Sequence, residues 1–567
     1  MARARWTSSS AVRSSWVETS SRYRPTVSEG LAPLSAPTTL ALMAFPNSAS
    51  STPLVENTRP GGIWQLVVPK ALPAGILRAS VSRPTQFRLL VALTIVWAVW
   101  AGWSLIGRAT PYQLRVLDDL GAPIAEAVAE VDGKQVGTSG TDGFITAEWK
   151  PSATVLEVSA PGHIPQRLTI AERPEGVVDV VLKARVLRGR VVDPDGRPVA
   201  RAQVIAGSAE GYSDDEGRFD LRRAEPGTVL VQRPAWLATE FSWDGGPGET
   251  VVEIAPFTAR AVHVTGEAVR DRFDEFIELA RTTELNALMI DLKDETGLIW
   301  YGTTNPLALE VGADFTMYDL REVVARAQAE GLYVIGRLVV FNDPVVALRK
   351  PSLAVWDSSA DAPYNSRGQY FLDPTDPDAR QYGLDLAVEA CAMGVDEIQF
   401  DYVRFPDVRS EAAVFDGGVS QDVRIATITG FLSDAVDLLH PLGCAVAADI
   451  FGFITKAVDD GGIGQRWEDV AQVVDVVSPM VYPSHYDPGW YGFDDPNAYP
   501  GPMVQRALGD AISRLPRSVV VRPWLQDFGY NSDQVRAQIV SAEEYGLGWM
   551  LWNAESNITT DALMPDD

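Results

Sequence analysis

The run ALMIDLKD, residues 287–294, decides the fold of the larger part of this chain. It begins with four apolar residues and ends in charge, at Asp291, Lys293 and Asp294. A short apolar run of this kind predicts a strand buried on both faces, as in a parallel sheet. Further runs of the same kind alternate with helical stretches such as DRFDEFIELARTTE, residues 271–284. We therefore expect repeated βα units after residue 257.

Eight such runs occur, and eight βα units in about 300 residues fit a closed barrel. The fold expected for residues 258–565 is therefore a (β/α)8 TIM barrel. An open, doubly wound sheet is the alternative, but its usual phosphate-binding signal, GxGxxG after the first strand, is absent. The runs lie at 261–266, 287–294, 333–341, 397–405, 445–453, 476–486, 519–528 and 548–554.

Polar or aromatic residues follow the apolar part of seven of these runs. In a TIM barrel the C-terminal ends of the strands build the active site. Packing alone explains such a pattern poorly, because unpaired buried charge is costly. We expect a functional cleft at this end of the barrel. Its candidate residues are Asp291, Lys293, Arg337, Asp401, Arg404, Asp449, Tyr482, His485, Trp524, Gln526, Asp527, Trp552 and Asn553.

The residue types at this end favour carboxylate chemistry. The chain has four histidines and neither HxH nor HExxH, which disfavours a zinc hydrolase with histidine ligands. It also lacks the GxSxG motif of serine hydrolases. Carboxylates walled by Trp and Tyr remain, and glycoside hydrolysis needs one carboxylic acid and one carboxylate. No metal or cofactor is expected.

The same region resembles a known family. The segments NALMIDLKDETGLIWY, YVIGRLVVFNDPVVA, DEIQFDYVRFP, VRPWLQDF and GWMLWNA are similar to the successive motifs of the "putative glycosyl hydrolase" family of the TIM-barrel glycosidase clan. The resemblance covers nearly all of residues 260–560. It implies the barrel fold and glycosidase activity on a polysaccharide or oligosaccharide.

Asp401 and Asp449 are the candidate catalytic pair. Asp401 ends the fourth strand, where several related glycosidases carry the nucleophile, and Arg404 could keep it ionised. A structural Asp401–Arg404 ion pair is the alternative. Asp449 ends the fifth strand, and the apolar Ile450 and Phe451 favour a raised pKa and the role of acid. Its alternatives are a ligand of sugar hydroxyls or a partner for Lys293.

The other candidates are expected to contact substrate. Asp291 and Lys293 share parity on the second strand, so both should point inward, and a salt bridge to each other or to Asp401 is an equal alternative. Aromatic residues stack on sugar rings, although core packing is their commoner role. Tyr482 and His485 are expected to hydrogen-bond sugar hydroxyls, and Trp524 and Trp552 to stack on sugar rings. Asp527 is a further candidate for a transition-state stabiliser or an acid.

The N-terminal part predicts a membrane anchor. Residues 1–86 are rich in Ser, Ala, Pro, Thr and Arg and are expected to be disordered. The uncharged run 89–106 is just long enough to span a bilayer, which places a transmembrane helix at 87–108. Arginines upstream and acidic sequence downstream put everything after Gly107 outside the membrane. A cleaved signal peptide is the alternative.

Residues 112–256 contain an internal repeat with an offset of about 75 residues. Alternating apolar residues broken by DG and EG turns predict two small all-β sandwich domains, 112–184 and 185–256. The second resembles the carboxypeptidase regulatory-like family closely and the first loosely. Neither shows catalytic residues, so we expect spacers.

Charge and cysteine usage add two expectations. The net charge is −27, and residues 1–88 contribute about +7 of it, so the rest carries −34. This acidic body argues against a nucleic-acid-binding protein. Cys391 and Cys444 are expected to be buried free thiols, with one disulfide the alternative in an oxidising compartment. The combined hypothesis is a membrane-anchored extracytoplasmic glycosidase; its rivals are a non-catalytic carbohydrate-binding barrel and an envelope scaffold protein.

Overall fold

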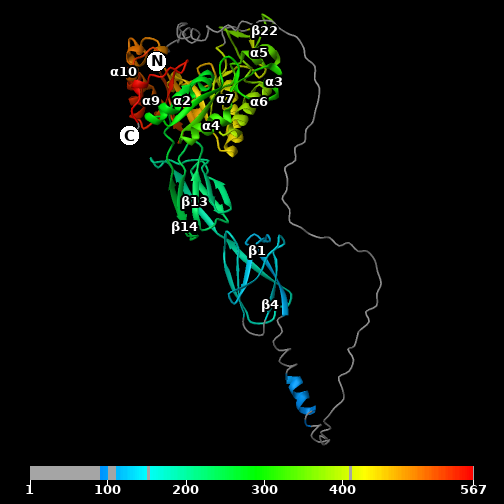
Figure 1. Ribbon diagram of the computed structural model, residues 1–567. Helices are drawn as coiled ribbons and strands as arrows, with labels where there is room; N and C mark the ends of the chain where they lie inside the picture. The colour runs from blue at the N-terminus through cyan, green and yellow to red at the C-terminus, as the bar shows by residue number, and fades with distance from the viewer. Residues whose placement is uncertain are drawn as a thin grey trace, which may run out of the picture.

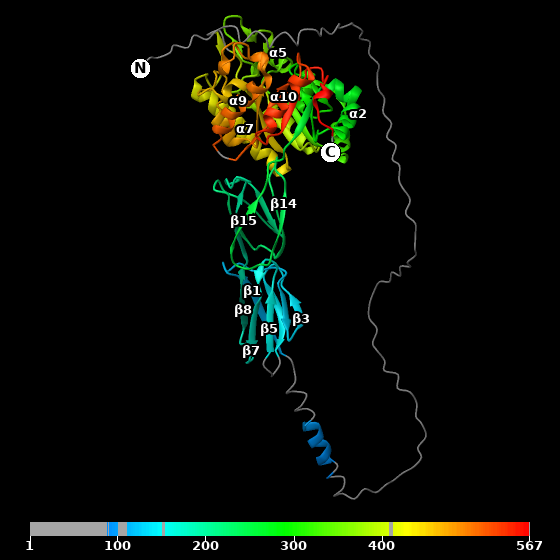
Figure 2. The ribbon, with the colours of Figure 1, turned by 90° about the vertical axis from the view of Figure 1, so that its left-hand side faces the viewer.

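The computed structural model describes Arg88 and residues 90–99, 110–149, 154–407, 412–516 and 518–565. Two bodies made of strands and a larger body of strands and helices follow one another in a row (Figures 1 and 2). The segment predicted to be disordered, 1–86, lies outside the described residues.

The C-terminal body is a closed barrel of eight parallel strands. The first strand, β16, pairs with both the second strand, β17, and the last, β31, which closes the ring. The predicted TIM barrel is therefore confirmed, and the open sheet is wrong. The seventh run supplies two short pieces, which both pair with β28. The strands are β16 (Arg260–Val264), β17 (Ala287–Lys293), β20 (Tyr333–Val339), β25 (Glu397–Asp401), β27 (Ala445–Phe451), β28 (Val476–Val481), β29 (Val520–Val521) with β30 (Trp524–Gln526), and β31 (Trp549–Trp552).

Helices surround the barrel and bury one apolar face each against the strands. Phe276 and Phe431 come from two of these helices and lie in one core with the strand residue Leu288. Side-chain caps start several of them; Thr265, for example, accepts a hydrogen bond from the backbone of Ala268. The helices are α2 (Gly266–Thr282), α3 (Pro306–Val311), α4 (Leu320–Ala329), α5 (Pro344–Arg349), α6 (Pro377–Ala392), α7 (Gln421–Leu439), α8 (Trp467–Val473), α9 (Pro500–Ser513) and α10 (Ser532–Glu543).

Short strands in the loops enlarge the C-terminal end of the barrel. Two of them extend the main sheet beyond β17, and the others lie in loops after β20 and β25. They are β18 (Ile299–Tyr301), β19 (Asp314–Tyr318), β21 (Trp356–Asp357), β22 (Ala362–Pro363), β23 (Asn365–Ser366), β24 (Gln369–Tyr370) and β26 (Ala413–Val414).

The two N-terminal bodies each contain two sheets around a small apolar core. The same loop occurs once in each body. In the first body Asp118 accepts backbone hydrogen bonds from Leu120 and Ala122, and in the second Asp193 accepts them from Asp195 and Arg197. The resemblance to the carboxypeptidase regulatory-like family stays a prediction. The first body contains β1 (Thr110–Asp118), β2 (Val128–Val131), β3 (Lys134–Thr138), β4 (Phe144–Trp149), β5 (Thr154–Ser159), β6 (His163–Ile164), β7 (Gln166–Ile170) and β8 (Val177–Ala184). The second contains β9 (Val186–Val192), β10 (Gln203–Ala206), β11 (Ala209–Tyr212), β12 (Arg218–Arg222), β13 (Gly227–Gln232), β14 (Thr239–Trp243) and β15 (Glu249–Glu253).

The second body packs against the N-terminal end of the barrel. Ala445, Val476 and Val520, at the starts of three barrel strands, belong to the same apolar cluster as its core. Beside them, the buried Arg233 pairs with Asp475 at 3.2 Å, and His440 contacts the other oxygen of Asp475 at 2.7 Å. Burial alone would raise the pKa of Asp475, but these two partners outweigh burial and lower it to about 2. The second body therefore covers this end of the barrel.

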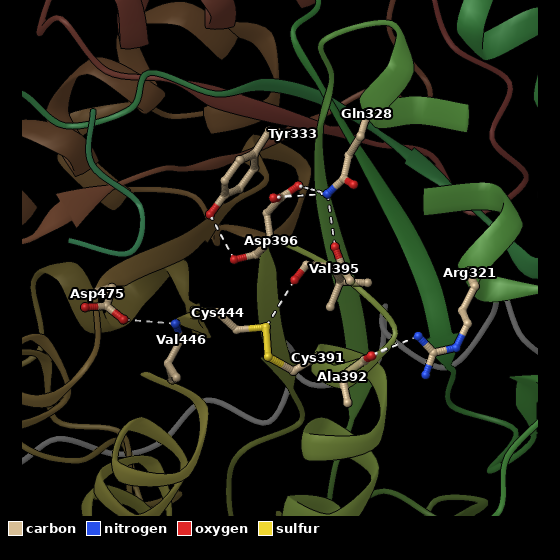
Figure 3. The surroundings of a disulfide bond; sticks show 11 residues. Arg321, Gln328, Tyr333, Cys391, Ala392, Val395, Asp396, Cys444, Val446 and Asp475 are labelled. Atoms are coloured by element: carbon tan, nitrogen blue, oxygen red, sulfur yellow. Dashed lines mark hydrogen bonds between the residues drawn. A yellow bond between two sulfur atoms is a disulfide. The ribbon is translucent and has the colours of Figure 1, made fainter. Parts of the chain in front are cut away.

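A disulfide joins Cys391, at the end of α6, to Cys444, just before β27 (Figure 3). The prediction of two free thiols is therefore wrong, and the alternative holds. The pair lies 53 residues apart in sequence. Sequence spacing could not show the pairing, because the fold alone brings the end of α6 to the start of β27.

Removing this disulfide should destabilise the barrel by about 2–4 kcal/mol, because the cross-link restricts the unfolded chain. We expect the variant with Cys391→Ser and Cys444→Ser to unfold at a clearly lower denaturant concentration than the oxidised protein. Wild type with reductant is the control and should match the variant. Equal midpoints for oxidised and reduced wild type would contradict the expectation.

Part of the predicted anchor, 87–108, is described, namely Arg88 and residues 90–99, and the latter are helical. Among the residues with described structure, no helix is long and apolar enough to cross a membrane. The rest of the predicted anchor lies outside the described residues, and the anchor stays a prediction.

Candidate active site

Arg337 is the centre of a carboxylate cluster at the C-terminal ends of three neighbouring strands. It lies on β20, opposite Asp291 of β17 and Gln399 of β25. Its Nε and Nη2 donate to Oδ2 of Asp401 at 3.0 and 2.6 Å, and its Nη1 donates to Asp291 at 2.8 Å. Nη2 also donates to Glu295. One buried guanidinium thus holds three carboxylates, an arrangement that its planar fork of donors suits.

Asp401 ends β25 and is held from both sides. Beyond Arg337, it accepts a hydrogen bond at 2.6 Å from the backbone of Tyr402. Tyr402 has a φ of +50°, a left-handed conformation that is costly for a bulky side chain. Strained backbone of this kind clusters at functional sites. Donors around both oxygens suit an ionised carboxylate.

The predicted Asp401–Arg404 pair is wrong. Arg404 donates to the carbonyl of Phe405 at 3.0 Å, and its guanidinium lies within about 5 Å of three aromatic ring centres. The cation that holds Asp401 comes instead from β20, as Arg337. Arg404 therefore stabilises the loop after β25 through cation–π contacts.

His263, on β16, completes the cluster on the far side of Asp291. Its Nε2 lies 2.9 Å from Asp291 and its Nδ1 lies 2.8 Å from the carbonyl oxygen of Asn553. Burial alone would raise the pKa of Asp291, but His263 and Arg337 outweigh it and lower the pKa to about 2. Both neighbours of the ring, the Asp291 carboxyl and the Asn553 carbonyl, can accept a hydrogen bond from it. Its ring stacks on Trp552 at 4.2 Å.

Asp449, on the next strand, β27, lies in a different environment. Its Oδ1 accepts hydrogen bonds from Gln399 at 2.5 Å and from the indole of Trp524 at 2.6 Å. Its Oδ2 is buried, and no residue in the described part of the chain donates a hydrogen bond to it. Burial, and then the charge of Asp401, raise the pKa of Asp449 well above its usual range. Burial therefore favours the protonated form of Asp449.

Asp294 and Glu295 follow β17 in a turn at the edge of the cluster. Asp294 accepts hydrogen bonds from the backbone and hydroxyl of Thr296. Burial, and then the charges of Glu295 and Asp291, raise the pKa of Asp294 to about 7. The side chain of Glu295 is 30% exposed.

Lys293 is directed away from this cluster, although parity predicted that it would point inward with Asp291. A register shift between Asp291 and Lys293 interrupts the pairing of β17 with β20. Lys293 instead forms a fully buried ion pair with Asp343 at 3.0 Å and donates to the carbonyl of Val339 at 2.7 Å. Neither Asp291, nor Asp401, nor Asp449 is its partner, so all three predicted pairings are wrong.

The remaining candidates divide between the cluster and the loops around it. Trp524 contacts Asp449, and Trp552 lies 4.8 Å from the guanidinium of Arg337. Tyr482 is buried, and its pKa is raised well above the usual range by burial and then by the charges of Asp449 and Asp401. His485 packs against Tyr482 and Phe528. The contacts with sugar that we predicted for these four residues stay predictions.

Gln526, Asp527 and Asn553 hold loops together. Gln526 accepts a hydrogen bond from the backbone of Ser484 and donates to the carbonyl of Phe528. The side chain of Asn553 donates to the carbonyl of Asp527 at 2.6 Å. Asp527 accepts from the backbone of Thr559 at 3.0 Å, and burial raises its pKa to about 6.

Replacing Asp527 by Asn should change how stability depends on pH. A carboxyl whose pKa is raised by folding holds its proton more tightly in the folded state, so its contribution to stability falls as pH rises from about 4 to about 6. Asn does not titrate. As pH rises from 4 to 7, the free energy of unfolding of Asp527→Asn should therefore increase by roughly 1–3 kcal/mol relative to that of the wild type. Unfolding midpoints at both pH values measure this change, and a variant at an exposed position, Asp494→Asn, is the control. If the difference in midpoint between Asp527→Asn and wild type were the same at both pH values, the pKa of Asp527 could not be raised.

Three residues of the cluster were not among the candidates predicted from the sequence: His263, Glu295 and Gln399. His263 lies within the first run, AVHVTG, where a histidine among apolar residues was the available signal. Glu295 directly follows the charged end of the second run, and Gln399 shares inward parity with Asp401. Glu295 could have been found by extending the search one residue beyond the second run, and Gln399 by extending it two residues before Asp401.

The fold and the cluster define a class: a TIM barrel with a carboxylate centre at the C-terminal ends of its strands. Residues 261–558 match the family described as "Putative glycosyl hydrolase domain", and the chain belongs to this family. The family match supports a glycosidase-like function.

Among solved structures, a hypothetical protein from Ruminiclostridium thermocellum ATCC 27405 is 34% identical, over 33% of this chain and 96% of that chain, with a TM-score of 0.31. The glycoside hydrolase domain of PgaB (BpsB) from Bordetella bronchiseptica is 13% identical, over 53% and 95% of the two chains, with a TM-score of 0.41. The glycoside hydrolase domain of PelA from Pseudomonas aeruginosa is 12% identical, over 53% and 96%, with a TM-score of 0.31. No curated protein matches this chain.

Proposed function

We propose that the barrel hydrolyses glycosidic bonds in an extracellular or cell-envelope polysaccharide. One observation carries the proposal: two carboxyl groups on neighbouring strands lie in different environments. Asp401 accepts hydrogen bonds from the guanidinium of Arg337, whereas burial raises the pKa of Asp449. Glycosidases need one carboxylate and one carboxylic acid, and different environments are what separate the two. Membership of the glycosyl hydrolase family supports the same reaction.

In this proposal Asp401 acts as nucleophile or base. Its predicted partner, Asp449, has the raised pKa that an acid requires. A general acid must also reach the oxygen that it protonates, however, and Oδ2 of Asp449 is buried. The raised pKa supports Asp449 as the acid, and the buried oxygen does not.

We also propose that the barrel works outside the cytoplasmic membrane, held by an anchor at 87–108. The Cys391–Cys444 disulfide supports an oxidising compartment, because disulfides are rare in the reducing cytosol. The anchor itself rests on the uncharged run 89–106 and the arginines before it.

A glycan panel tests the proposal. Purified protein is incubated with neutral, amino-sugar and uronic-acid polysaccharides, and new reducing ends are measured; release from at least one is expected. The Asp401→Asn variant serves as the inactive control. Binding to a polysaccharide without any new reducing ends would favour the non-catalytic carbohydrate-binding barrel. Neither binding nor release, with a protein partner retained in a pull-down, would favour the scaffold.

A further inference from the structure

Glu295 is the most exposed carboxylate of the cluster around Arg337. Its side chain is 30% exposed, against 10% for Asp401 and 4% for Asp291. A group that exchanges a proton with a polysaccharide must touch it, so exposure separates the carboxylates that can do this from those that cannot. Among the three partners of Arg337, Glu295 is the one that a bound sugar would reach first.

Glu295 is also close to Asp401. Both carboxylates accept a hydrogen bond from the same nitrogen, Nη2 of Arg337. Their accepting oxygens therefore lie no farther apart than two hydrogen-bond lengths, about 6 Å. Retaining glycosidases separate their two carboxyl groups by about 5–5.5 Å, and inverting ones by roughly 6.5–9.5 Å. The upper bound for the pair Glu295–Asp401 lies below the separation of inverting enzymes and favours retention.

Asp449 lacks the access that Glu295 has. The residue is 1% exposed, and both of its hydrogen bonds, from Gln399 and Trp524, go to Oδ1. The other oxygen is enclosed by the barrel interior. A proton on Oδ2 therefore cannot pass to a sugar without displacing the side chains around it. Asp449 is better suited to position Trp524 and Gln399 than to act on substrate.

A proton is available beside Glu295. Asp294 precedes it in the same turn, and the two carboxyls, with Asp291, crowd negative charge together. Such crowding favours retention of one proton among the group near neutral pH. Asp294, with a pKa of about 7, is therefore a carboxyl next to Glu295 in the chain that can hold a proton near neutral pH.

We propose that Glu295, rather than Asp449, is the catalytic acid and base that works with Asp401, and that the enzyme retains anomeric configuration. This inference rests on the proposed function. The Glu295 carboxyl gives its proton to the glycosidic oxygen as the bond from that oxygen to the anomeric carbon breaks, and an Asp401 oxygen bonds the anomeric carbon. The Glu295 carboxylate then takes a proton from water, whose oxygen replaces Asp401 on that carbon. Asp401 leaves as a carboxylate, and both groups are restored.

The test compares Glu295→Gln with the matched variant Asp449→Asn on whichever polysaccharide the wild type cleaves. It also uses the 2,4-dinitrophenyl glycoside of the released sugar, whose leaving group needs no proton. Glu295→Gln should lose about 10²–10⁴-fold in kcat/KM on the polysaccharide and less than about tenfold in kcat/KM on the dinitrophenyl glycoside. Its kcat on the dinitrophenyl glycoside should still fall, because Gln cannot take a proton from the water that releases Asp401. Asp449→Asn should fall by similar factors on both substrates. Proton NMR of the first-formed product from the wild type should show the anomer of the substrate.

Two further readouts keep the outcome decisive. Azide added to Glu295→Ala should restore turnover and yield a glycosyl azide of retained configuration. Thermal unfolding should show that Glu295→Gln, Glu295→Ala and Asp449→Asn all fold. Inversion by the wild type, wild-type activity of Glu295→Gln, or the leaving-group dependence appearing in Asp449→Asn would each overturn the inference. Those results leave the proposed function standing. A wild type that cleaves no glycan would instead overturn the proposed function, and this inference with it.

Discussion

Asp401→Asn should lower turnover by about 10³-fold or more and leave the fold intact. The amide keeps the shape of the side chain but cannot attack the anomeric carbon or take a proton from water. The fold should tolerate the change, because Arg337 keeps its hydrogen bonds to Asp291 and Glu295. Reducing-end release under saturating polysaccharide measures the loss, and circular dichroism measures the fold.

The exposed Asp494→Asn is the matched control for this prediction and should keep full activity. If Asp401→Asn retained wild-type turnover on a polysaccharide that the wild type cleaves, Asp401 could be neither nucleophile nor base. A large loss of activity together with a lower unfolding temperature would also count against the prediction, because it would make the role of Asp401 structural.

Arg337→Met should destabilise the barrel by about 3–5 kcal/mol and abolish activity. The change leaves Asp291, Glu295 and Asp401 crowded together without their common cation, and unpaired buried charge is costly. Denaturant unfolding followed by tryptophan fluorescence measures the loss. Because protonation relieves the crowding, the deficit should be smaller at pH 4.5 than at pH 7.5.

The control for Arg337→Met is Arg281→Met on α2. Arg281 pairs with Glu330 at 2.6 Å, but both side chains are open to solvent, and exposed pairs contribute less than about 1 kcal/mol. A deficit for Arg337→Met as small as that of the control, or one that does not change with pH, would show that the cluster does not depend on this cation.

The barrel could be predicted because apolar runs identify buried strands without knowledge of their neighbours. Each of the eight runs lies on a barrel strand, and polar ends such as Asp401 and Asp291 do meet at one cluster. Strand periodicity carries this information directly, since inward and outward side chains alternate. The position of the cluster at the C-terminal ends follows from the parallel arrangement.

The partners of these residues could not be predicted, because partners come from neighbouring strands rather than neighbouring positions. Sequence proximity suggested Arg404 for Asp401, whereas the cation is Arg337, 64 residues away. The parity of Lys293 failed at a register shift in β17, which no property of the sequence reveals. Glu295 was missed because it lies in a turn, beyond the strand to which the periodicity applies.

The closed N-terminal end of the barrel fixes the direction in which the Arg337 cluster faces. The second strand-rich body covers that end through Ala445, Val476 and Val520, and the first body continues the row away from the barrel. The C-terminal ends of the barrel strands therefore point away from the two strand-rich bodies. A polysaccharide that reaches the Arg337 cluster must approach from the end of the barrel that the second body does not cover. Lengthening or shortening the two bodies would change how far the cluster lies from residue 110 without changing its chemistry.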